Sequence, residues 1–280
     1  MAVVTMEEYG ALPAVRITAA DGAQATVALF GAHLLSWKTA DGKERMFVSA
    51  QTALDGSKPI RGGVPVIFPQ FNLRGPGPKH GFARESTWRL TDSGGDGALS
   101  FLQFCLTRDD LAPAVAAWWP HAFELQLRVI LSGDALEFDL KVRNTGTQDL
   151  PLAVALHSYY DVGQLAATSV SGLQHARYTD HHLNTLVQET PALHFTEKQD
   201  RLYQAPPSLT LNTADATLRL EQQGFSQWVV WNPGADDAHA MADLADDEYL
   251  RFICIEPARV DQQALAGGAE WRGRHRIAAN

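Results

Sequence analysis

Two side chains in the sequence could together move protons. His157 ends the apolar run in PLAVALHSYYDV, and Glu256 follows the apolar run in RFICIEPARV. A carboxylate directly after a buried strand must be paired, exposed in a cleft or protonated. Imidazole has an unperturbed pKa of about 6.5, so it gives or takes a proton near neutral pH. The two residues suit general acid and base catalysis, and a purely structural role for either stays open.

A second group of residues could bind an anion. Residues 58–84 contain five Lys or Arg and no Asp or Glu, in a chain whose formal charge is −9. They also contain five of the 14 prolines and five of the 22 glycines, so we expect stiff loops in this segment. Arg61 and Arg84 suit a phosphate best because a guanidinium donates two parallel hydrogen bonds. A basic surface loop paired with acidic neighbours is the alternative.

Motifs of other enzyme classes are missing from the sequence. It has no GxSxG, HExxH, CxxC or GxxxxGK[ST] pattern. The nearest approach to a nucleotide loop, RGPGPKHG, has Pro76 and Pro78 where backbone N–H donors would be needed. The negative net charge argues against nucleic acid or an anionic membrane as a partner. No pattern indicates a metal, a cofactor or a particular oligomeric state.

The first residues and the cysteines predict a cytoplasmic protein. The start MAVVTMEEYG has no basic region and reaches Glu7 and Glu8 too early for the apolar core of a signal peptide. No apolar stretch approaches about twenty residues, the length of a membrane-spanning helix. Cys105 and Cys254 lie in the alternating apolar runs FLQFCL and RFICIEP. We expect both to be buried free thiols.

Hydrophobic periodicity predicts the elements that must position these groups. Residues 123–143 alternate apolar and polar side chains with period two, with a turn at residues 132–134, which predicts a β-hairpin. The same signal recurs in AVRITAADGAQATVALFG, SLTLNTADATLRLEQ, QWVVW and YLRFICIEP. The best helical candidate covers only residues 236–244. The pattern predicts an all-β fold, a large antiparallel β-sandwich with few short helices.

The sequence gives no sign of a domain boundary. It has no internal repeat, low-complexity linker or composition break, so we expect a single β-sandwich domain over residues 1–280. Large aromatic side chains in sandwiches usually fill the core. We therefore expect Trp118, Trp119, Trp228 and Trp231 to be core residues, with stacking on a sugar face as the alternative.

Several motifs, taken in order, resemble the aldose 1-epimerase superfamily and, within it, the hexose-6-phosphate mutarotases, also called glucose-6-phosphate 1-epimerases. The likeness covers nearly the whole chain, in KPIRGGVPVIFPQF, KHGFAR, WPHAFEL, the NTG turn, ALHSYYDV, DRLY, VVWNP, FICIEPARV and EWRGRHRI. It implies the large antiparallel β-sandwich of galactose mutarotase-like proteins. Asn72 is a departure, because relatives often have glycine there, and Ala258 and Ala266 are two further departures.

The resemblance also implies catalytic and anion-binding roles. It makes Glu256 the general base and His157 the general acid, and it places Arg61 and Arg84 near a phosphate.

The resemblance implies substrate contacts for three further residues. It places His80 and Asp200 on the sugar ring or its hydroxyls, and it gives Gln70 a contact with the substrate. From the residues alone, Asp200 in EKQDRLY would be a loop residue in a turn or paired with Arg201.

The activity implied is cofactor-independent interconversion of the α and β anomers of hexose 6-phosphates, glucose 6-phosphate above all. A small sugar phosphate would be the partner, and neither metal nor nucleotide is needed. The alternatives are an aldose 1-epimerase for unphosphorylated sugars and a non-catalytic sugar-phosphate-binding module on the same fold. Glycoside hydrolysis would instead need a carboxylate pair at a set separation, which Asp200 and Glu256 could supply.

Overall fold

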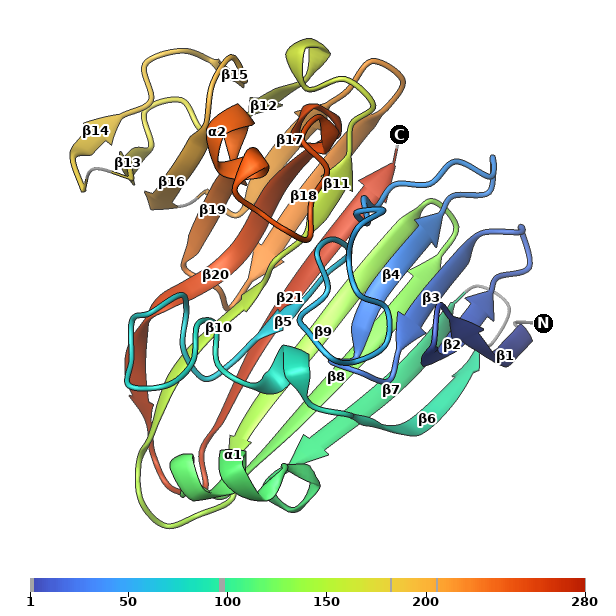
Figure 1. The fold of residues 1–280 in the computed structure, drawn as a ribbon, viewed down its shortest axis with the longest axis vertical. Helices are drawn as coiled ribbons and strands as arrows, with labels where there is room; N and C mark the ends of the chain where they lie inside the picture. Colours follow the sequence, from blue (N-terminus) through green and yellow to red (C-terminus); the bar gives the residue numbers. More distant parts are fainter. Residues whose placement is uncertain (1–2, 96–98, 182, 205, 280) are drawn as a thin grey trace.

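The computed structural model describes residues 3–95, 99–181, 183–204 and 206–279. The strands of these residues form three β-sheets. Within these ranges the strands of each sheet pair antiparallel. The predicted all-β fold with a large antiparallel sandwich is confirmed. Figure 1 shows the small N-terminal sheet at one side of the molecule, and α1 and α2 toward opposite ends.

The order of the strands across each sheet differs from their order along the chain, except in the smallest sheet. That four-stranded sheet contains β1 (Val3–Tyr9), β2 (Leu12–Thr18), β3 (Gln24–Ala28) and β4 (His33–Lys38). The nine-stranded sheet contains, from edge to edge, β15 (Ala192–His194), β12 (Ser169–Ser171), β17 (Ser208–Asn212), β18 (Thr217–Gln223), β21 (Glu270–Ala279), β9 (Ala135–Asn144), β8 (Phe123–Ser132), β7 (Ser100–Thr107) and β6 (Arg89–Gly95). The eight-stranded sheet contains, in the same sense, β14 (Thr185–Val187), β13 (Arg177–Thr179), β16 (Gln199–Gln204), β19 (Gln227–Asn232), β20 (Phe252–Leu265), β10 (Leu150–Leu156) and β5 (Val66–Ile67), and β11 (Tyr159–Asp161) pairs with β20.

The predicted hairpins form where the period-two pattern placed them. In β8 the side chains alternate between buried and half-buried from Phe123 to Ser132, as the alternation required. The strand then pairs with β9, and Ser132 lies opposite Ala135 across the turn. β2 with β3 and β17 with β18 are also adjacent antiparallel pairs.

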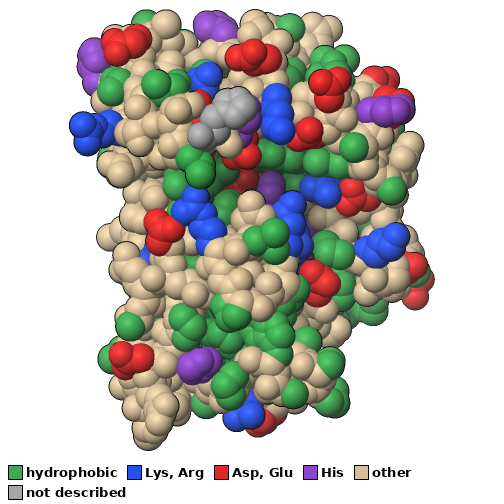
Figure 2. All heavy atoms as spheres, turned by 60° about the vertical axis from the view of Figure 1, so that its left-hand side comes forward, with side chains coloured by type: hydrophobic (Ala, Val, Ile, Leu, Met, Phe, Trp, Pro, Cys, Tyr) green, Lys and Arg blue, Asp and Glu red, His purple; other side chains and the backbone are tan. Residues whose placement is uncertain are grey.

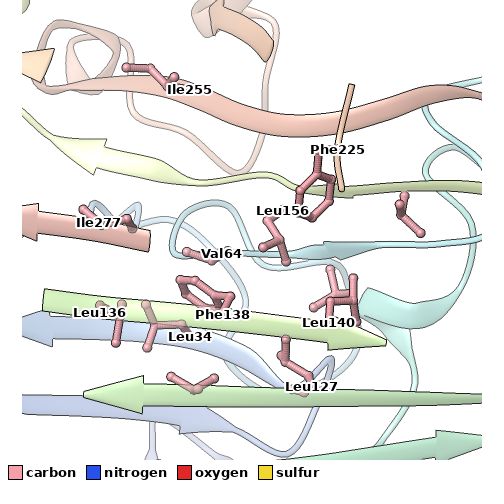
Figure 3. Packing of buried hydrophobic residues seen from close by; sticks show 14 of the residues in the cluster. Leu34, Val64, Leu127, Leu136, Phe138, Leu140, Leu156, Phe225, Ile255 and Ile277 are labelled. Atoms are coloured by element: carbon pink, nitrogen blue, oxygen red, sulfur yellow. The ribbon is translucent and has the colours of Figure 1, made fainter. Parts of the chain in front are cut away.

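A continuous apolar core joins the sheets. One buried cluster contains side chains from Val15 in β2 to Ile277 in β21. Phe138 of β9 and Leu156 of β10 belong to it, and Figure 3 shows these two side chains in the apolar layer between strands of different sheets. Burial of apolar area, worth about 25 cal/mol per Å², is the main stabilising term for such a layer. We infer from this shared core that the chain forms one domain.

The helical segments are short, and one prediction needs correction. α1 covers Pro113–Trp118 and α2 covers Gly234–His239, while short 3₁₀ turns cover Ala83–Glu85, Arg108–Asp110, Leu165–Ala167 and Glu248–Arg251. The predicted helix over residues 236–244 is therefore wrong beyond His239. The following residues leave the helix because Asp243 bonds to Arg61 and the Glu248 carboxylate accepts hydrogen bonds from the backbone at Ala50 and Ala245.

Most of the aromatic and cysteine predictions hold. Trp119 and Trp228 are buried, and Trp118 packs against the core. Trp231 differs, because it is only half-buried and lines a cavity. Cys105 and Cys254 are free and buried, as predicted.

The helices of the described ranges are all too short or too polar to cross a lipid bilayer. The compartment of the protein stays a prediction from the sequence.

We expect that neither Cys105 nor Cys254 reacts readily with a bulky thiol reagent in the folded protein. Both lie in strands, and burial raises the pKa of each thiol, which keeps the reactive thiolate scarce. Labelling with a chromogenic disulfide should be slow at neutral pH and fast after unfolding in denaturant. Rapid labelling of native protein with unchanged circular dichroism would contradict the burial of the labelled thiol.

Candidate active site

A cavity of about 510 Å³ opens beside the eight-stranded sheet. Six of the seven residues singled out from the sequence line it, namely Arg61, His80, Arg84, His157, Asp200 and Glu256. Figure 2 shows a hollow on this face of the molecule, with basic, acidic and histidine side chains gathered around it. The fold thus brings together residues that are up to 195 positions apart, as with Arg61 and Glu256 (256 − 61).

Successive side chains of strand β20 point to opposite faces of the sheet, and this alternation sets the direction of Glu256. Ile253 and Ile255 point into the core between the sheets, so Cys254 and Glu256 point to the opposite face. In the antiparallel register Val229 of β19 lies opposite Glu256, and it lines the cavity as well. The carboxylate is therefore held by a central strand whose other face is fixed in the core.

His157 follows directly after β10 and is held through its backbone. Its N–H donates to the carbonyl of Pro65 at 3.0 Å, and the N–H of Tyr159 donates to the carbonyl of Gly63 at 2.9 Å. Gly62 and Gly63 have positive φ angles, and a Cβ on Gly63 would overlap the Leu34 carbonyl. The RGG motif is thus required for the close approach that supports the histidine.

The imidazole of His157 stacks on the ring of Tyr159. The ring centroids are 4.8 Å apart and the planes differ by 7°. The rings of Trp231 and His80 contact the imidazole edge to face, at 5.9 and 5.6 Å. These contacts restrict the rotation of the imidazole ring on its side chain.

His157 and Glu256 contact each other at the floor of the cavity. The Nδ1 atom of His157 lies 3.3 Å from Oε1 of Glu256. Both side chains are buried, and neither His157 Nδ1 nor Glu256 Oε2 has a well-oriented hydrogen-bond partner in the described part of the chain. Buried polar atoms without partners are costly. They therefore mark the place where a polar ligand would be stabilised.

Burial shifts the pKa values of this pair in opposite directions. Desolvation raises the pKa of Glu256 well above its ordinary value, and the nearby Asp200 carboxylate adds to the shift. Desolvation likewise lowers the pKa of His157 well below its ordinary value. Because the carboxyl starts below the imidazole, the two shifts oppose the usual difference between them. Burial thus favours the neutral form of each group.

Asp200 lies in strand β16 and not in a loop, which corrects the interpretation from the residues alone. It pairs in register with Trp231 of β19, which in turn lies opposite Cys254 of β20. Its carboxylate lines the cavity, and partial burial raises its pKa. No ion pair joins it to Arg201 among the described residues.

His80 presents a neutral ring to the cavity. Burial, with the charges of Arg84, Lys79 and Arg61, lowers the pKa of His80 to about 2. Its Nδ1 accepts a hydrogen bond from the Asn72 N–H at 3.2 Å, so the ring proton resides on Nε2, which can donate to a sugar oxygen. Asn72 has φ of 50°, a left-handed conformation that favours glycine and that asparagine tolerates, which accounts for the departure at this position.

Several cations line the cavity. Arg84 is desolvated, which lowers its pKa, and its long contact with Glu85 measures 3.6 Å. Its Nε has no hydrogen-bond partner among the described residues. Lys58 and Lys79 also line the cavity, and neither pairs with a carboxylate within the described ranges. The pKa of Lys79 is lowered by burial and by its repulsion from Arg61 and Arg84.

Arg61 is already engaged by a carboxylate and a phenol. Its Nε and Nη2 atoms donate to Asp243 at 3.0 to 3.2 Å, and its Nη1 donates to the Tyr159 hydroxyl at 3.1 Å. The alternative interpretation of the basic segment, pairing with acidic neighbours, is thus correct for Arg61 and also for Arg74, which pairs with Asp261. For Lys58, Lys79 and Arg84 the anion-binding interpretation remains.

Gln70 lies outside the cavity lining. Its Nε2 donates to the carbonyls of Asn72 and Gly77, and its Oε1 accepts from the Gly77 N–H. The side chain is fully buried. It holds the loop that carries His80, which is an indirect contribution to the site.

Some cavity residues were not singled out from the sequence. Lys58 and Lys79 lie inside the basic segment, but a lysine lacks the planar fork that makes arginine the better phosphate ligand. Lys198 and Asp237 pair across the rim at 2.6 Å. Asp243 gave no sequence signal, because its contact with Arg61 spans 182 residues of chain.

The chain resembles known proteins over nearly its whole length. The family model described as "Aldose 1-epimerase" matches residues 13–278. A Cenchrus ciliaris protein named "Putative glucose-6-phosphate 1-epimerase" is 34% identical over 272 residues, which cover 91% of this chain and 81% of that protein. A protein of the same name from Escherichia coli (strain K12) is 35% identical over 246 residues, covering 84% of this chain and 79% of that protein.

Solved structures share the fold. The crystal structure of a protein described as a "putative mutarotase" from Salmonella typhimurium has a TM-score of 0.89 and 29% identity, covering 99% of this chain and 93% of that one. A galactose 1-epimerase from Lactobacillus acidophilus has a TM-score of 0.77 at 12% identity, covering 100% and 98%, which is a likeness of fold alone. Because the family model spans almost the entire sequence and the curated relatives exceed 30% identity, this chain belongs to the aldose 1-epimerase family.

Proposed function

We propose that this protein is an isomerase that interconverts the α and β anomers of hexose 6-phosphates, glucose 6-phosphate above all, without a cofactor. The observation that carries the proposal is the buried contact of 3.3 Å between His157 and Glu256 at the floor of a cavity that cations also line. The names of the curated relatives agree with it.

The closeness of acid and base suits ring opening. The two oxygens that exchange protons, O1 and O5, are bonded to the same carbon of the sugar, so the groups that serve them must lie side by side. In the proposed reaction Glu256 accepts the proton of O1 while His157 donates a proton to O5. The C1–O5 bond breaks and an open-chain aldehyde forms. Rotation about C1–C2 and reclosure with reversed roles give the other anomer.

The burial of the pair supports this reversible chemistry. A carboxyl with a raised pKa is a stronger base than an exposed one, and an imidazole with a lowered pKa is a stronger acid. A catalyst leaves the equilibrium between the anomers unchanged, so the same two groups serve ring opening and reclosure in both directions.

The cations that line the cavity support the proposal of a phosphorylated substrate. Arg84 and Lys79 project into the cavity without short ion pairs, and their mutual repulsion would be relieved by an anion. Arg61 is near them and retains a free N–H because Asp243 and Tyr159 use only part of its five donors. An unphosphorylated aldose would leave the largely buried Arg84 with only its long contact to Glu85.

A non-catalytic binding module is the alternative on the same fold. Such a module needs the cations and His80, but it gains nothing from a carboxylate and an imidazole that are buried against each other at a cost in desolvation. The His157–Glu256 contact therefore favours the enzyme.

Replacing Glu256 with Gln should remove most of the activity and keep the fold. The amide is nearly isosteric but cannot accept the O1 proton, and loss of general base catalysis costs on the order of 10²- to 10⁴-fold in rate. A polarimetric assay on freshly dissolved α-glucose 6-phosphate measures the rate. Glu270→Gln, at an exposed position of β21, is the matched control and should be fully active. Activity of Glu256→Gln within a few-fold of wild type would refute the assigned base.

Replacing His157 with Asn should lower kcat more than it raises KM. The proton given to O5 matters in the transition state, whereas ground-state binding relies mainly on other groups. Steady-state kinetics over a range of glucose 6-phosphate concentrations separates the two constants. A change confined to KM would make His157 a binding residue.

Replacing Arg84 with Ala should weaken the binding of glucose 6-phosphate by about 1.5–3 kcal/mol, the scale of a hydrogen bond to a charged group. Turnover of free glucose should hardly change. Arg84→Lys should recover only part of the loss, because an ammonium keeps the charge but not the planar fork. Arg74→Ala is the control, since Arg74 belongs to the same basic segment but pairs with Asp261 at 2.7 Å. If Arg84→Ala keeps the preference for the phosphorylated sugar, the phosphate assignment fails.

A further inference from the structure

Three buried side chains, two lining the cavity and one behind them, can reach a single ion. They are His157, Cys254 and Glu256, and their nitrogen, sulfur and oxygen atoms all lie within 4.8 Å of one another. All three are buried. The proposed reaction uses the histidine and the carboxylate but gives the thiol no part.

The histidine and carboxylate already have the spacing of metal ligands. Nδ1 of His157 lies 3.3 Å from Oε1 of Glu256. Two ligands about 2.0–2.1 Å from a tetrahedral zinc ion lie roughly 3.3 Å apart. In the described part of the chain, His157 Nδ1 has no well-oriented hydrogen bond beyond this contact and Glu256 Oε2 has no hydrogen bond, so an ion would satisfy both buried atoms.

Cys254 supplies the third ligand from the same strand. It lies two residues before Glu256 in β20 and therefore on the same face, opposite Tyr159 in the register of β11. Its sulfur lies within 4.8 Å of the other two ligand atoms, so a shift of at most roughly 1.3 Å brings it to a zinc–sulfur distance of about 2.3 Å. The thiol is covered by the apolar cluster that includes Phe47 and Phe252, so an ion reaches it from the cavity, past the histidine and carboxylate.

The chemistry of the three atoms selects the kind of metal. One imidazole, one thiolate and one carboxylate make a borderline-soft set that suits Zn²⁺ or Co²⁺, whereas Mg²⁺ and Ca²⁺ require oxygen ligands. Three protein ligands leave a fourth position that faces the cavity. Binding releases the proton of the thiol and any proton held by the carboxyl, and no atom is oxidised or reduced.

We propose that Zn²⁺ binds to His157, Cys254 and Glu256 in the sugar-free protein and inhibits it. The bound ion occupies the lone pairs that would take and deliver the protons of O1 and O5. Zinc and sugar phosphate therefore exclude each other. The inhibition rests on the proposed function, whereas the metal binding does not.

Cobalt tests the binding directly. Co²⁺ added to the sugar-free protein should produce the near-ultraviolet absorption that a thiolate–cobalt bond gives. Cys254→Ala should lose this band. Cys105→Ala is the matched control and should keep it, because that thiol is also buried but lies in β7 of the other large sheet. Saturating glucose 6-phosphate should diminish the band of the wild-type protein.

Inhibition of anomer interconversion is the second measurement. Loss of the sulfur ligand should raise the Zn²⁺ concentration for half-inhibition at least about tenfold. Even the loss of a residue that only hydrogen-bonds a metal ligand lowers metal affinity by about that factor. Cys254→Ala should keep most of its activity in the presence of a chelator. Circular dichroism and thermal unfolding verify its fold, and Cys254→Ser provides a second variant that retains volume.

The outcomes separate the metal site from the reaction. Absence of the cobalt band in wild-type protein, or an equal band in folded Cys254→Ala, would overturn the site. An unchanged zinc sensitivity of that variant would overturn it too. A wild-type band with no anomer interconversion in chelated protein would leave the site standing and refute the proposed function.

Discussion

A carboxylate and an imidazole withdrawn from water and placed 3.3 Å apart are the interaction on which the rest of this structure depends. Burial of either group alone would cost several kcal/mol, and their contact recovers only part of it. The large apolar core between the sheets supplies the stability that tolerates this cost. In the proposed reaction the pair acts as base and acid, and this role would account for its presence despite the cost.

Strand β20 shows how the fold meets this demand. Ile253 and Ile255 anchor one face of the strand in the core, and that anchorage fixes the direction of Glu256 on the other face. The RGG segment gives His157 its backbone support, and Tyr159 restricts its ring. The site is thus built on elements that the core already holds rigid, which keeps the acid and the base in a fixed geometry.

The charges around the cavity explain how an acidic protein can take an anion. At physiological ionic strength the net charge of −9 is screened beyond about 8 Å, so contacts inside the cavity decide the outcome. Arg84 is largely buried there, where an ion pair is stronger than at the surface, and the exposed Lys79 adds a second charge close to it. Asp243 neutralises Arg61 in part and limits the excess of positive charge. The same dense set of donors and lone pairs explains why a small cation could compete at the floor.

The sequence by itself determined the strands, their hairpins and the sandwich, because side chains alternate with period two wherever one face of a strand is buried. It also placed His157 and Glu256 at the ends of apolar runs, and the resemblance to the family grouped them with Arg61, Arg84, His80 and Asp200. Only the tertiary structure decided that Asp200 lies in a strand facing the cavity and that Gln70 hydrogen-bonds the loop that carries His80. It also decided that Asp243 forms an ion pair with Arg61. Each of these depends on contacts between segments far apart in the chain, and local periodicity carries no record of such contacts.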